Sequence, residues 1–230
     1  MRPLRVAVLA SGRGSNFEAI AKANLPIQLV GVFSDKPAAR ALELARARGI
    51  PAVALDAKKY TDRKTFDREF FARVADAKPD LLVLAGFMRV IDASVIAAWH
   101  GRAINIHPSL LPKYAGLHTH QRAIDAGDRV HGASVHFVTA ELDGGPVIAQ
   151  VRIQVRPGED AASLAARLLP LEHRLLVATV GAIAEMRIEL TPSGILLDKR
   201  LLTAPVSMTK LTFRKPRSNK VELRADPTVR

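Results

Sequence analysis

The chain has 230 residues, of which 48% are hydrophobic, so it can bury the core of one large domain or two small ones. It contains no cysteine, which excludes a disulfide framework, a thiolate metal site and a cysteine nucleophile, and fits a reducing cytoplasm. No apolar run approaches the length of a membrane-spanning helix, and the short apolar start runs into a glycine-rich turn instead of a signal-peptide cleavage site. We therefore expect a cytoplasmic protein without a membrane segment.

The formal net charge is +12, and part of it lies in residues 201–230, which hold seven Lys or Arg against two acidic residues. A basic surface can bind nucleic acid or attract an anionic small molecule. No zinc pattern, helix-turn-helix signature or basic run interleaved with aromatic residues accompanies the charge. An anionic small-molecule substrate is therefore favoured over nucleic acid.

The first predicted element is a strand over residues 4–10, whose continuous apolar run suits burial on both faces of a parallel sheet. The turn Ser-Gly-Arg-Gly-Ser-Asn at 11–16 follows, and then a helical pattern. Glycines let the backbone approach a ligand closely, and the free N–H groups of a helix N-terminus attract anions. Phe17 stands where a dinucleotide-binding loop has its third glycine, so a single phosphate monoester is favoured over a pyrophosphate. The alternative is a turn that only caps the helix.

Strands and helices then alternate, which is typical of a mostly parallel sheet with helices on both faces. The pattern predicts strands over 27–33, 51–55 and 81–85, and helices over 38–48, 62–77 and 92–99. Gly86 follows the third of these strands, and the mixed apolar residues after it suit the wall of a cleft for a flat ligand.

The next strand carries the most chemistry. Asn105 and His107 alternate with two isoleucines, so the amide and the imidazole share one face of the strand. Pro108 ends the strand and places the pair at a carboxyl end, where open α/β sheets bind their ligands. An amide can stabilise an oxyanion and a histidine can move a proton near neutral pH, so the pair suits a reaction at a carbonyl group. The alternative is a turn asparagine beside a structural histidine.

The residues after this strand predict a lid and two further strands. A turn-rich stretch at 108–116 suits a mobile lid. Strands are expected over 130–139 and 147–155, and between them Asp143 lies in a glycine-rich turn. Such an aspartate most often makes an Asx turn, whereas the functional interpretation is that its carboxylate orients His107 and raises the pKa of the imidazole.

The longest helical pattern covers 159–184 and contains Pro170, which predicts a kink or break near its middle. Such a kink would aim Glu172 inward, although a solvated glutamate is the usual case. A small hairpin follows. We expect an α/β domain over 1–200 and a basic extension over 201–230 that is flexible or loosely docked.

Four stretches occur together in the order found in one enzyme family. They read Ser-Gly-Arg-Gly-Ser-Asn at 11–16, Ala-Gly-Phe-Met-Arg at 85–89, Asn-Ile-His-Pro-Ser-Leu-Leu-Pro-Lys-Tyr at 105–114 and Leu-Asp-Gly-Gly-Pro at 142–146. Over roughly residues 4–198 the chain resembles the folate-dependent phosphoribosylglycinamide formyltransferases of purine synthesis. The third and fourth stretches are the specific ones, because glycine-rich turns alone are common.

The resemblance implies transfer of a formyl group from 10-formyltetrahydrofolate to the amine of glycinamide ribonucleotide, without a metal, by a cytoplasmic monomer or homodimer. The amine is itself the nucleophile, an amide and a protonated imidazole stabilise the oxygen, and a carboxylate orients and charges the imidazole. The matching positions are Asn105, His107 and Asp143 for catalysis; Gly14, Ser15 and Asn16 for the substrate phosphate; Glu172 near the substrate amine; and Arg63, Met88, Arg89, Val90, Ile91, Asn105, Glu141, Leu142 and Asp143 for the folate.

Two departures and three alternatives stay open. Ala115 stands where the family usually has proline, and Leu-Pro-Leu at 169–171 replaces a more polar stretch, which leaves the lid and those substrate contacts undecided. A formyltetrahydrofolate deformylase shares the Asn, His and Asp trio but uses water as acceptor and usually carries an N-terminal regulatory domain. A methionyl-tRNA formyltransferase would suit the basic charge but normally carries a further C-terminal domain. A nucleic-acid-binding module has the charge alone in its favour.

Overall fold

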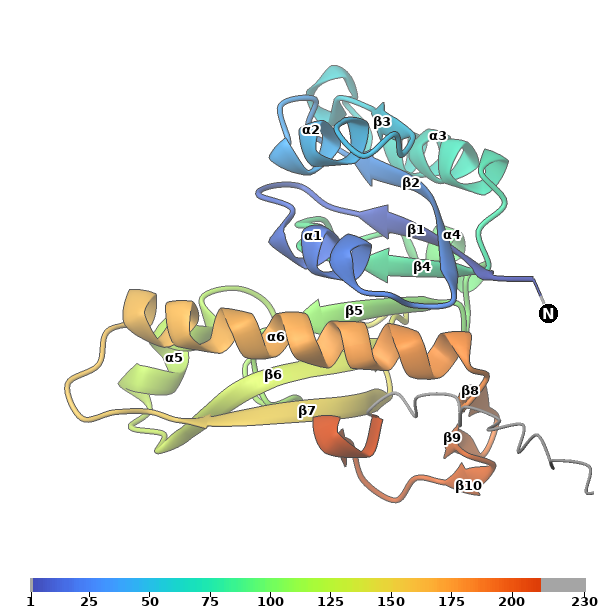
Figure 1. The fold of residues 1–230 in the computed structure, drawn as a ribbon. Helices are drawn as coiled ribbons and strands as arrows, with labels where there is room; N and C mark the ends of the chain where they lie inside the picture. The colour runs from blue at the N-terminus through green and yellow to red at the C-terminus, as the bar shows by residue number, and fades with distance from the viewer. Residues whose placement is uncertain (1, 212–230) are drawn as a thin grey trace, which may run out of the picture.

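The computed structural model describes residues 2–211 as a central sheet flanked by helices (Figure 1). The strands of the sheet are β1 (Leu4–Leu9), β2 (Ile27–Ser34), β3 (Ala52–Ala54), β4 (Leu81–Leu84), β5 (Ala103–His107), β6 (Val130–Phe137), β7 (Val147–Gln154) and β11 (Val206–Ser207). The helices are α1 (Ser15–Lys22), α2 (Arg40–Arg46), α3 (Arg63–Asp76), α4 (Ala93–Ala97), α5 (Thr119–Asp125) and α6 (Ala161–Ala184), with 3-10 turns η1 (Ala57–Lys59) and η2 (Met208–Leu211). A separate small sheet contains β8 (Ile188–Thr191), β9 (Gly194–Leu197) and β10 (Arg200–Leu201).

The strand order of the large sheet is β11-β7-β6-β5-β4-β1-β2-β3. Strands β1 to β5 pair with one another in parallel, whereas β6 runs antiparallel to both β5 and β7. The predicted α/β class, a mostly parallel sheet with antiparallel strands toward the C-terminal part, is confirmed. Because β1, β4 and β5 are parallel, the loops that follow them meet at one edge of the sheet.

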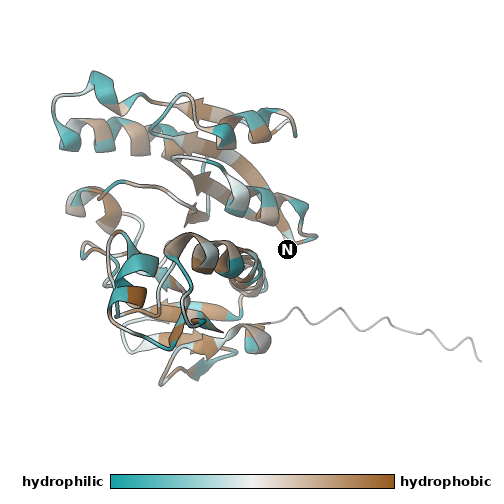
Figure 2. Cartoon of the chain, turned by 90° about the vertical axis from the view of Figure 1, so that its left-hand side faces the viewer, coloured by the Kyte–Doolittle hydropathy of each residue, from teal (hydrophilic) through white to brown (hydrophobic). Residues whose placement is uncertain are grey.

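The core lies on both faces of this sheet. On β1, Val6 and Val8 face the layer of α1, α2 and α6, while Ala7 and Leu9 face the layer of α3 and α4, as the two-residue period of a strand requires. Phe70 of α3 is buried in the second layer. The strands are mostly hydrophobic in Figure 2, and hydrophilic residues gather on the outer helices. Burial on both faces explains why the parallel strands read as continuous apolar runs.

Helix α6 crosses the sheet as one unbroken helix of 24 residues (Figure 1). The expected break at Pro170 is therefore wrong. A proline removes one N–H and frees the carbonyl of the residue four positions earlier, here Ala166. Both residues are exposed, so water can satisfy that carbonyl, while the buried face of the helix stays packed on the sheet.

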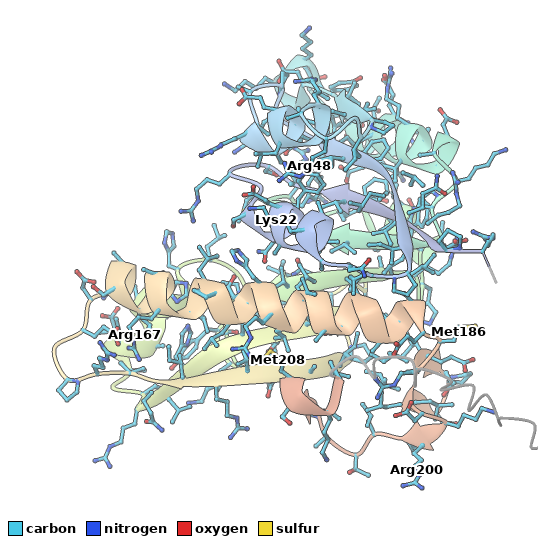
Figure 3. All side chains as sticks on the ribbon, in the orientation of Figure 1. Lys22, Arg48, Arg167, Met186, Arg200 and Met208 are labelled. Carbon is cyan, nitrogen blue, oxygen red and sulfur yellow. The ribbon has the colours of Figure 1, made fainter. Side chains whose placement is uncertain are left out.

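The chain remains part of the fold beyond residue 200, where a basic extension was expected to begin. Strand β11 pairs with β7, and η2 packs against α6. Val206 and Leu211 are buried in the core, and Met208 lies beside α6 and β7 (Figure 3). The rest of the expected extension, residues 212–230, lies outside the described part of the chain.

The packing of η2 against α6 predicts that Leu211→Ala lowers the free energy of unfolding by about 2 kcal/mol or more, because the substitution removes the contacts of a buried leucine and leaves a cavity. Leu211 is 1% exposed, whereas Leu201, only ten residues earlier, is 51% exposed. Leu201→Ala is therefore the matched control and should change stability by no more than about 0.5 kcal/mol. Urea unfolding measures both, and equal effects would contradict the docking.

Candidate active site

Polar side chains from β5, β6 and the β6–β7 loop meet at the carboxyl edge of the sheet. Nδ1 of His107 lies 3.4 Å from Oδ2 of Asp143, and Nδ2 of Asn105 donates to Oδ1 of the same carboxylate at 3.3 Å. Asp143 also accepts a hydrogen bond of 2.9 Å from the N–H of Gly116. The side chain of Asp143 is only 9% exposed, so these groups interact away from bulk water.

The tight turn that carries Asp143 has a steric cause. Gly145 lies so close to the carbonyl of Phe137 that a Cβ atom there would overlap it. The Gly-Gly pair therefore lets the β6–β7 loop fold back against the end of β6. This places Asp143 opposite Asn105 and His107, although it lies 36 residues later in the chain than His107.

The contact made by the second ring nitrogen of His107 determines which nitrogen of the neutral ring carries the proton. Nε2 lies 2.9 Å from the carbonyl oxygen of Tyr114, which can only accept, so Nε2 carries a proton. The neutral ring then turns the lone pair of Nδ1 toward Asp143, and a second proton on Nδ1 would be shared with that carboxylate. The stretch expected to form a lid therefore supplies two main-chain contacts to the site, at Tyr114 and Gly116.

Burial lowers the pKa of His107 below its usual value, while the Tyr114 carbonyl and the Asp143 carboxylate oppose this effect. Asp143 thus raises the pKa of His107 as the sequence predicted, but burial outweighs this effect, and a strand pattern does not show how far the ring is removed from water. For Asp143, burial alone would raise the pKa, but the neighbouring ring of His136, the hydrogen bond from the N–H of Gly116 and the nearby His107 lower it overall. The carboxylate stays charged beside a ring that is mostly neutral at pH 7.

His136 is a member of the site that sequence reasoning missed. Its Nδ1 donates to the carbonyl of Phe137 at 2.9 Å, so Nε2 of the neutral ring is an acceptor. Nε2 lies 3.1 Å from Nδ2 of Asn105 and 3.6 Å from Oδ1 of Asp143. The antiparallel register pairs Asn105 directly with His136, and that register was the signal the sequence lacked.

Beside this trio lies a cavity of about 810 Å³, which we name the loop cavity because residues 11–16 line it. Gly14 adopts a left-handed conformation with φ 76° just before α1, and a Cβ atom there would lie 2.7 Å from Cα of Ala41. Only glycine fits this position. Ser15 and Asn16 form the first turn of α1 and face the cavity, and the amide oxygen of Asn16 is buried without a hydrogen-bond partner in the described chain.

Glu172 of α6 also lines the loop cavity. Burial raises the pKa of its carboxyl group to about 7, although Arg13 and the amide of Asn16 act in the opposite direction. A carboxyl group in this state can either donate or accept a hydrogen bond at neutral pH, so it can adapt to a ligand.

Asn105 and Asp143 line a smaller cavity of about 80 Å³, which we name the strand cavity. Of the positions predicted to line a folate site, those at this cavity are Arg89, Val90, Ile91, Asn105, Glu141, Leu142 and Asp143. Met88 lines the loop cavity instead, and Arg63, the exposed first residue of α3, lines neither.

Asp67 is a second residue that sequence reasoning missed. Its side chain on α3 is 1% exposed, accepts a 2.8 Å hydrogen bond from the N–H of Asp92 and faces Nε of Arg89 at 4.0 Å. The guanidinium of Arg89 also lies 4.3 Å from the centre of the Phe66 ring. These contacts hold Arg89 at the mouth of the strand cavity.

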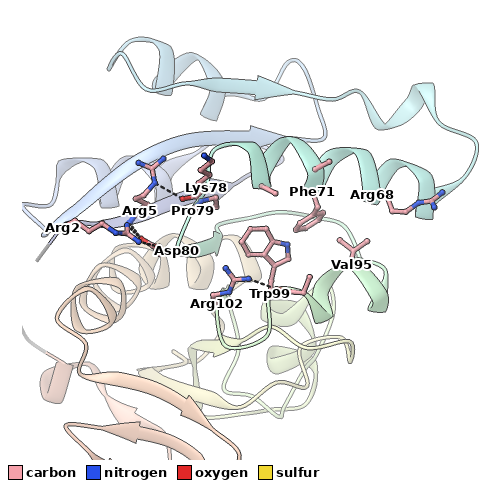
Figure 4. Close-up of a pocket in the computed structure, with 13 residues that line it drawn as sticks. Arg2, Arg5, Arg68, Phe71, Lys78, Pro79, Asp80, Val95, Trp99 and Arg102 are labelled. Carbon is pink, nitrogen blue, oxygen red and sulfur yellow. Dashed lines mark hydrogen bonds and ion pairs between the residues drawn. The ribbon is translucent and has the colours of Figure 1, made fainter.

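A separate cavity of about 770 Å³ lies at the opposite edge of the sheet, where β1, β4 and β5 begin (Figure 4). Two of its arginines are engaged by the protein, because Arg2 pairs with Asp80, and Arg5 donates to the carbonyls of Ala77 and Lys78. The residues that line it include no histidine. We therefore place the candidate site at the carboxyl edge. Within residues 2–211, no group of three or more His, Asp or Glu is arranged to hold a metal ion, and no helix is both long and apolar enough to cross a membrane.

Comparison with known proteins decides the family. Residues 4–180 match the formyl transferase family. The phosphoribosylglycinamide formyltransferase of Escherichia coli is 42% identical over 203 residues, covering 86% of this chain and 96% of that enzyme. The chain belongs to the phosphoribosylglycinamide formyltransferase family. The enzyme of the same name from Haemophilus influenzae is 35% identical to this formyltransferase over 86% of the chain and 95% of its own length.

Solved structures agree with this assignment. The phosphoribosylglycinamide formyltransferase of Coxiella burnetii superposes on this formyltransferase with a TM-score of 0.85 and 37% identity, covering 89% of this chain and 99% of its own. The fold is therefore shared along nearly the whole length of this relative.

The raised pKa of Glu172 predicts a pH-dependent stability. In the unfolded chain this group titrates near 4.5, so between about pH 4.5 and 7 the folded state binds more protons and stability falls as pH rises. The shift corresponds to about 3 kcal/mol. Relative to Glu172→Gln, the free energy of unfolding of the native chain should fall by up to this amount between pH 4.5 and 8. Urea unfolding of both proteins across this range measures the change, and a difference in unfolding free energy that does not vary with pH would contradict the raised pKa of Glu172.

Proposed function

We propose that this formyltransferase moves the formyl group of 10-formyltetrahydrofolate to the amine of glycinamide ribonucleotide, giving the formylated ribonucleotide and tetrahydrofolate. The observation that carries the proposal is the meeting of Asn105, His107 and Asp143 next to two cavities, the strand cavity, which Asn105 and Asp143 line, and the loop cavity, which Ile106 and Pro108 line. Two ligands bound in these cavities would bring their reacting groups together at this trio.

The loop cavity suits a ribonucleotide monophosphate. N–H groups at the start of α1 and the hydroxyl of Ser15 can bind the phosphate, and Arg13 and Lys36 line the same cavity with positive charge. The unpartnered oxygen of Asn16 and the carboxyl of Glu172 can accept hydrogen bonds from the hydroxyl or amine groups of the ligand. The phosphate end and the donor-bearing end of the substrate thus each find complementary groups.

The surroundings of the strand cavity suit a flat, partly apolar co-substrate. Met88, Val90, Leu117 and Leu142 expose 45–67% of their surface, although large apolar side chains are usually covered. Val90 and Leu142 line the strand cavity itself, next to Asn105 and Asp143. A pterin ring bound there would cover this apolar surface and bring its formyl group to the trio.

The side chains of the trio have separate roles in this reaction. Attack by the amine places negative charge on the formyl oxygen, and a positioned N–H group stabilises such charge. Both hydrogens of the Asn105 amide face acceptors, Asp143 and His136. Asn105 therefore donates a hydrogen bond to the formyl oxygen after it releases its longer, 3.3 Å bond to Asp143. His107 takes a proton on Nδ1 and passes it on, and Asp143 stabilises the imidazolium that forms.

Two alternatives share the trio but fit less well. Water, the acceptor of a deformylase, has no use for a phosphate loop or for a cavity of about 810 Å³. The two bacterial relatives that this chain matches over nearly their full length are named phosphoribosylglycinamide formyltransferases, which favours the ribonucleotide over methionyl-tRNA as acceptor. A cytoplasmic location and a monomeric or homodimeric state stay predictions.

An acceptor test separates these functions. The purified protein is incubated with 10-formyltetrahydrofolate, with and without glycinamide ribonucleotide, and the release of tetrahydrofolate is followed. We expect release that requires the ribonucleotide. Equal release in its absence would identify a deformylase and overturn the proposal.

His107→Ala and Asp143→Asn should each lower kcat by about two orders of magnitude or more, because each removes part of the proton relay. Ser15→Ala is the contrasting variant. It should mainly raise KM for the ribonucleotide, since phosphate binding is shared by the ground state and the transition state. Steady-state kinetics measure all three, and an unchanged kcat in His107→Ala would refute its role.

A further inference from the structure

The segment of residues 113–116 contacts the candidate active site through main-chain groups. The carbonyl of Tyr114 accepts from Nε2 of His107, and the N–H of Gly116 donates to the carboxylate of Asp143, each at 2.9 Å. Tyr114 has a φ of 57°, a left-handed conformation that costs free energy in a residue with a side chain and persists only where other contacts hold it. The two contacts with the site therefore depend on what holds this segment.

One carboxylate holds the side chains of the segment. Nζ of Lys113 lies 2.9 Å from both carboxylate oxygens of Asp128, and the hydroxyl of Tyr114 donates to Oδ2 of Asp128 at 2.8 Å. These hydrogen bonds lower the pKa of Asp128, so the carboxylate is charged at neutral pH. We name Lys113, Tyr114 and Asp128 the Asp128 cluster. None of the three is among the described residues that line the loop cavity or the strand cavity.

The position of Asp128 has a local cause. Gly127 follows α5 with a φ of 68°, and the N–H of Asp128 then donates to the carbonyl of Ala123 at 3.0 Å. Such a left-handed glycine ends a helix and turns the chain back. Arg122 of α5 adds a 2.6 Å hydrogen bond to the carbonyl of Ala115. The end of α5 thus holds the segment at both its side chains and its main chain.

The carbonyl of Tyr114 also opposes a local electrostatic preference. Nδ1 of His107 faces the carboxylate of Asp143 at 3.4 Å, and a neutral imidazole beside a carboxylate favours a hydrogen on the nitrogen that faces the charge. With that hydrogen on Nδ1, the ring could not take a further proton at this nitrogen. Because Tyr114 instead attracts the hydrogen to Nε2, the lone pair of Nδ1 stays free to accept one.

We propose that Asp128 is a positioning residue that, through the hydroxyl and main chain of Tyr114, keeps the hydrogen of neutral His107 on Nε2. This inference rests on the proposed role of His107 as the group that takes up a proton on Nδ1. Without the Asp128 cluster, the segment relaxes out of its left-handed conformation. The contact between the Tyr114 carbonyl and Nε2 then weakens, and Asp143 draws the hydrogen to Nδ1.

The ring of His107 reports this effect directly. ¹⁵N NMR at pH 8 distinguishes a ring nitrogen that carries a hydrogen from one that does not, and would compare the native chain with Asp128→Ala, Tyr114→Phe and Asp125→Ala. Tyr114→Phe removes a single hydroxyl and leaves the main chain in place, so it tests the proposal even if Asp128→Ala does not fold. Asp125 is the matched control, because it is an exposed aspartate of α5 whose carboxylate bonds to Gln121.

We expect the native chain and Asp125→Ala to show the hydrogen on Nε2. In Asp128→Ala and Tyr114→Phe the signals of the two ring nitrogens should move toward each other, as the second tautomer becomes populated. In formyl transfer, Tyr114→Phe should lower kcat by about three- to tenfold, as expected for the loss of one hydrogen bond. The KM for the ribonucleotide should stay within about twofold, because the lost contact acts on the chemical step.

Unchanged ring signals in Tyr114→Phe would overturn the proposal, even if kcat falls, because the cluster would then act on the fold alone. Equal changes in Asp125→Ala and Tyr114→Phe would overturn it as well. The ring signals are measured without turnover, so they test the Asp128 cluster independently of the acceptor test. Absence of formyl transfer in the native chain would overturn the proposed function instead.

Discussion

The Asp143 carboxylate is the point on which the site depends. It is nearly excluded from water and accepts hydrogen bonds from the amide of Asn105 and the N–H of Gly116. It also faces the rings of His107 and His136. Removing this charge would leave two imidazoles and an amide without their common partner. Burial of a carboxylate is costly unless hydrogen bonds and opposite charge compensate it, and here several donors converge on one group. The same contacts orient Asn105 and His107, the two groups that act on the formyl group in the proposed reaction.

The fold brings these groups together through strand direction. Because β1, β4 and β5 are parallel, the loop at 11–16, the residues after Gly86 and the Asn105–His107 pair all lie at one edge of the sheet. The change to antiparallel pairing at β6 then sets His136 opposite Asn105 and returns the chain to Asp143. The loop cavity and the strand cavity both lie at this edge. The proposed ribonucleotide and formyl folate would thus lie next to each other.

The sequence predicted the alternation of strands and helices and the shared face of Asn105 and His107, because both depend on short-range periodicity. It did not predict the part played by His136 or Asp67, since these depend on strand register and on packing between distant segments. The net lowering of the His107 pKa was not predicted for a similar reason, because burial is a property of the whole fold. Pro170 shows the opposite case, in which a strong local preference is overridden by an otherwise well-packed helix.

The most direct test of this account follows the ring of His107 by NMR across pH 4–8, in the native chain and in Asp143→Asn. Because the carboxylate favours the charged ring against the effect of burial, the account predicts that the pKa of His107 lies below its usual value and falls further when the charge is removed. An unchanged or higher pKa in Asp143→Asn would contradict the central role of Asp143.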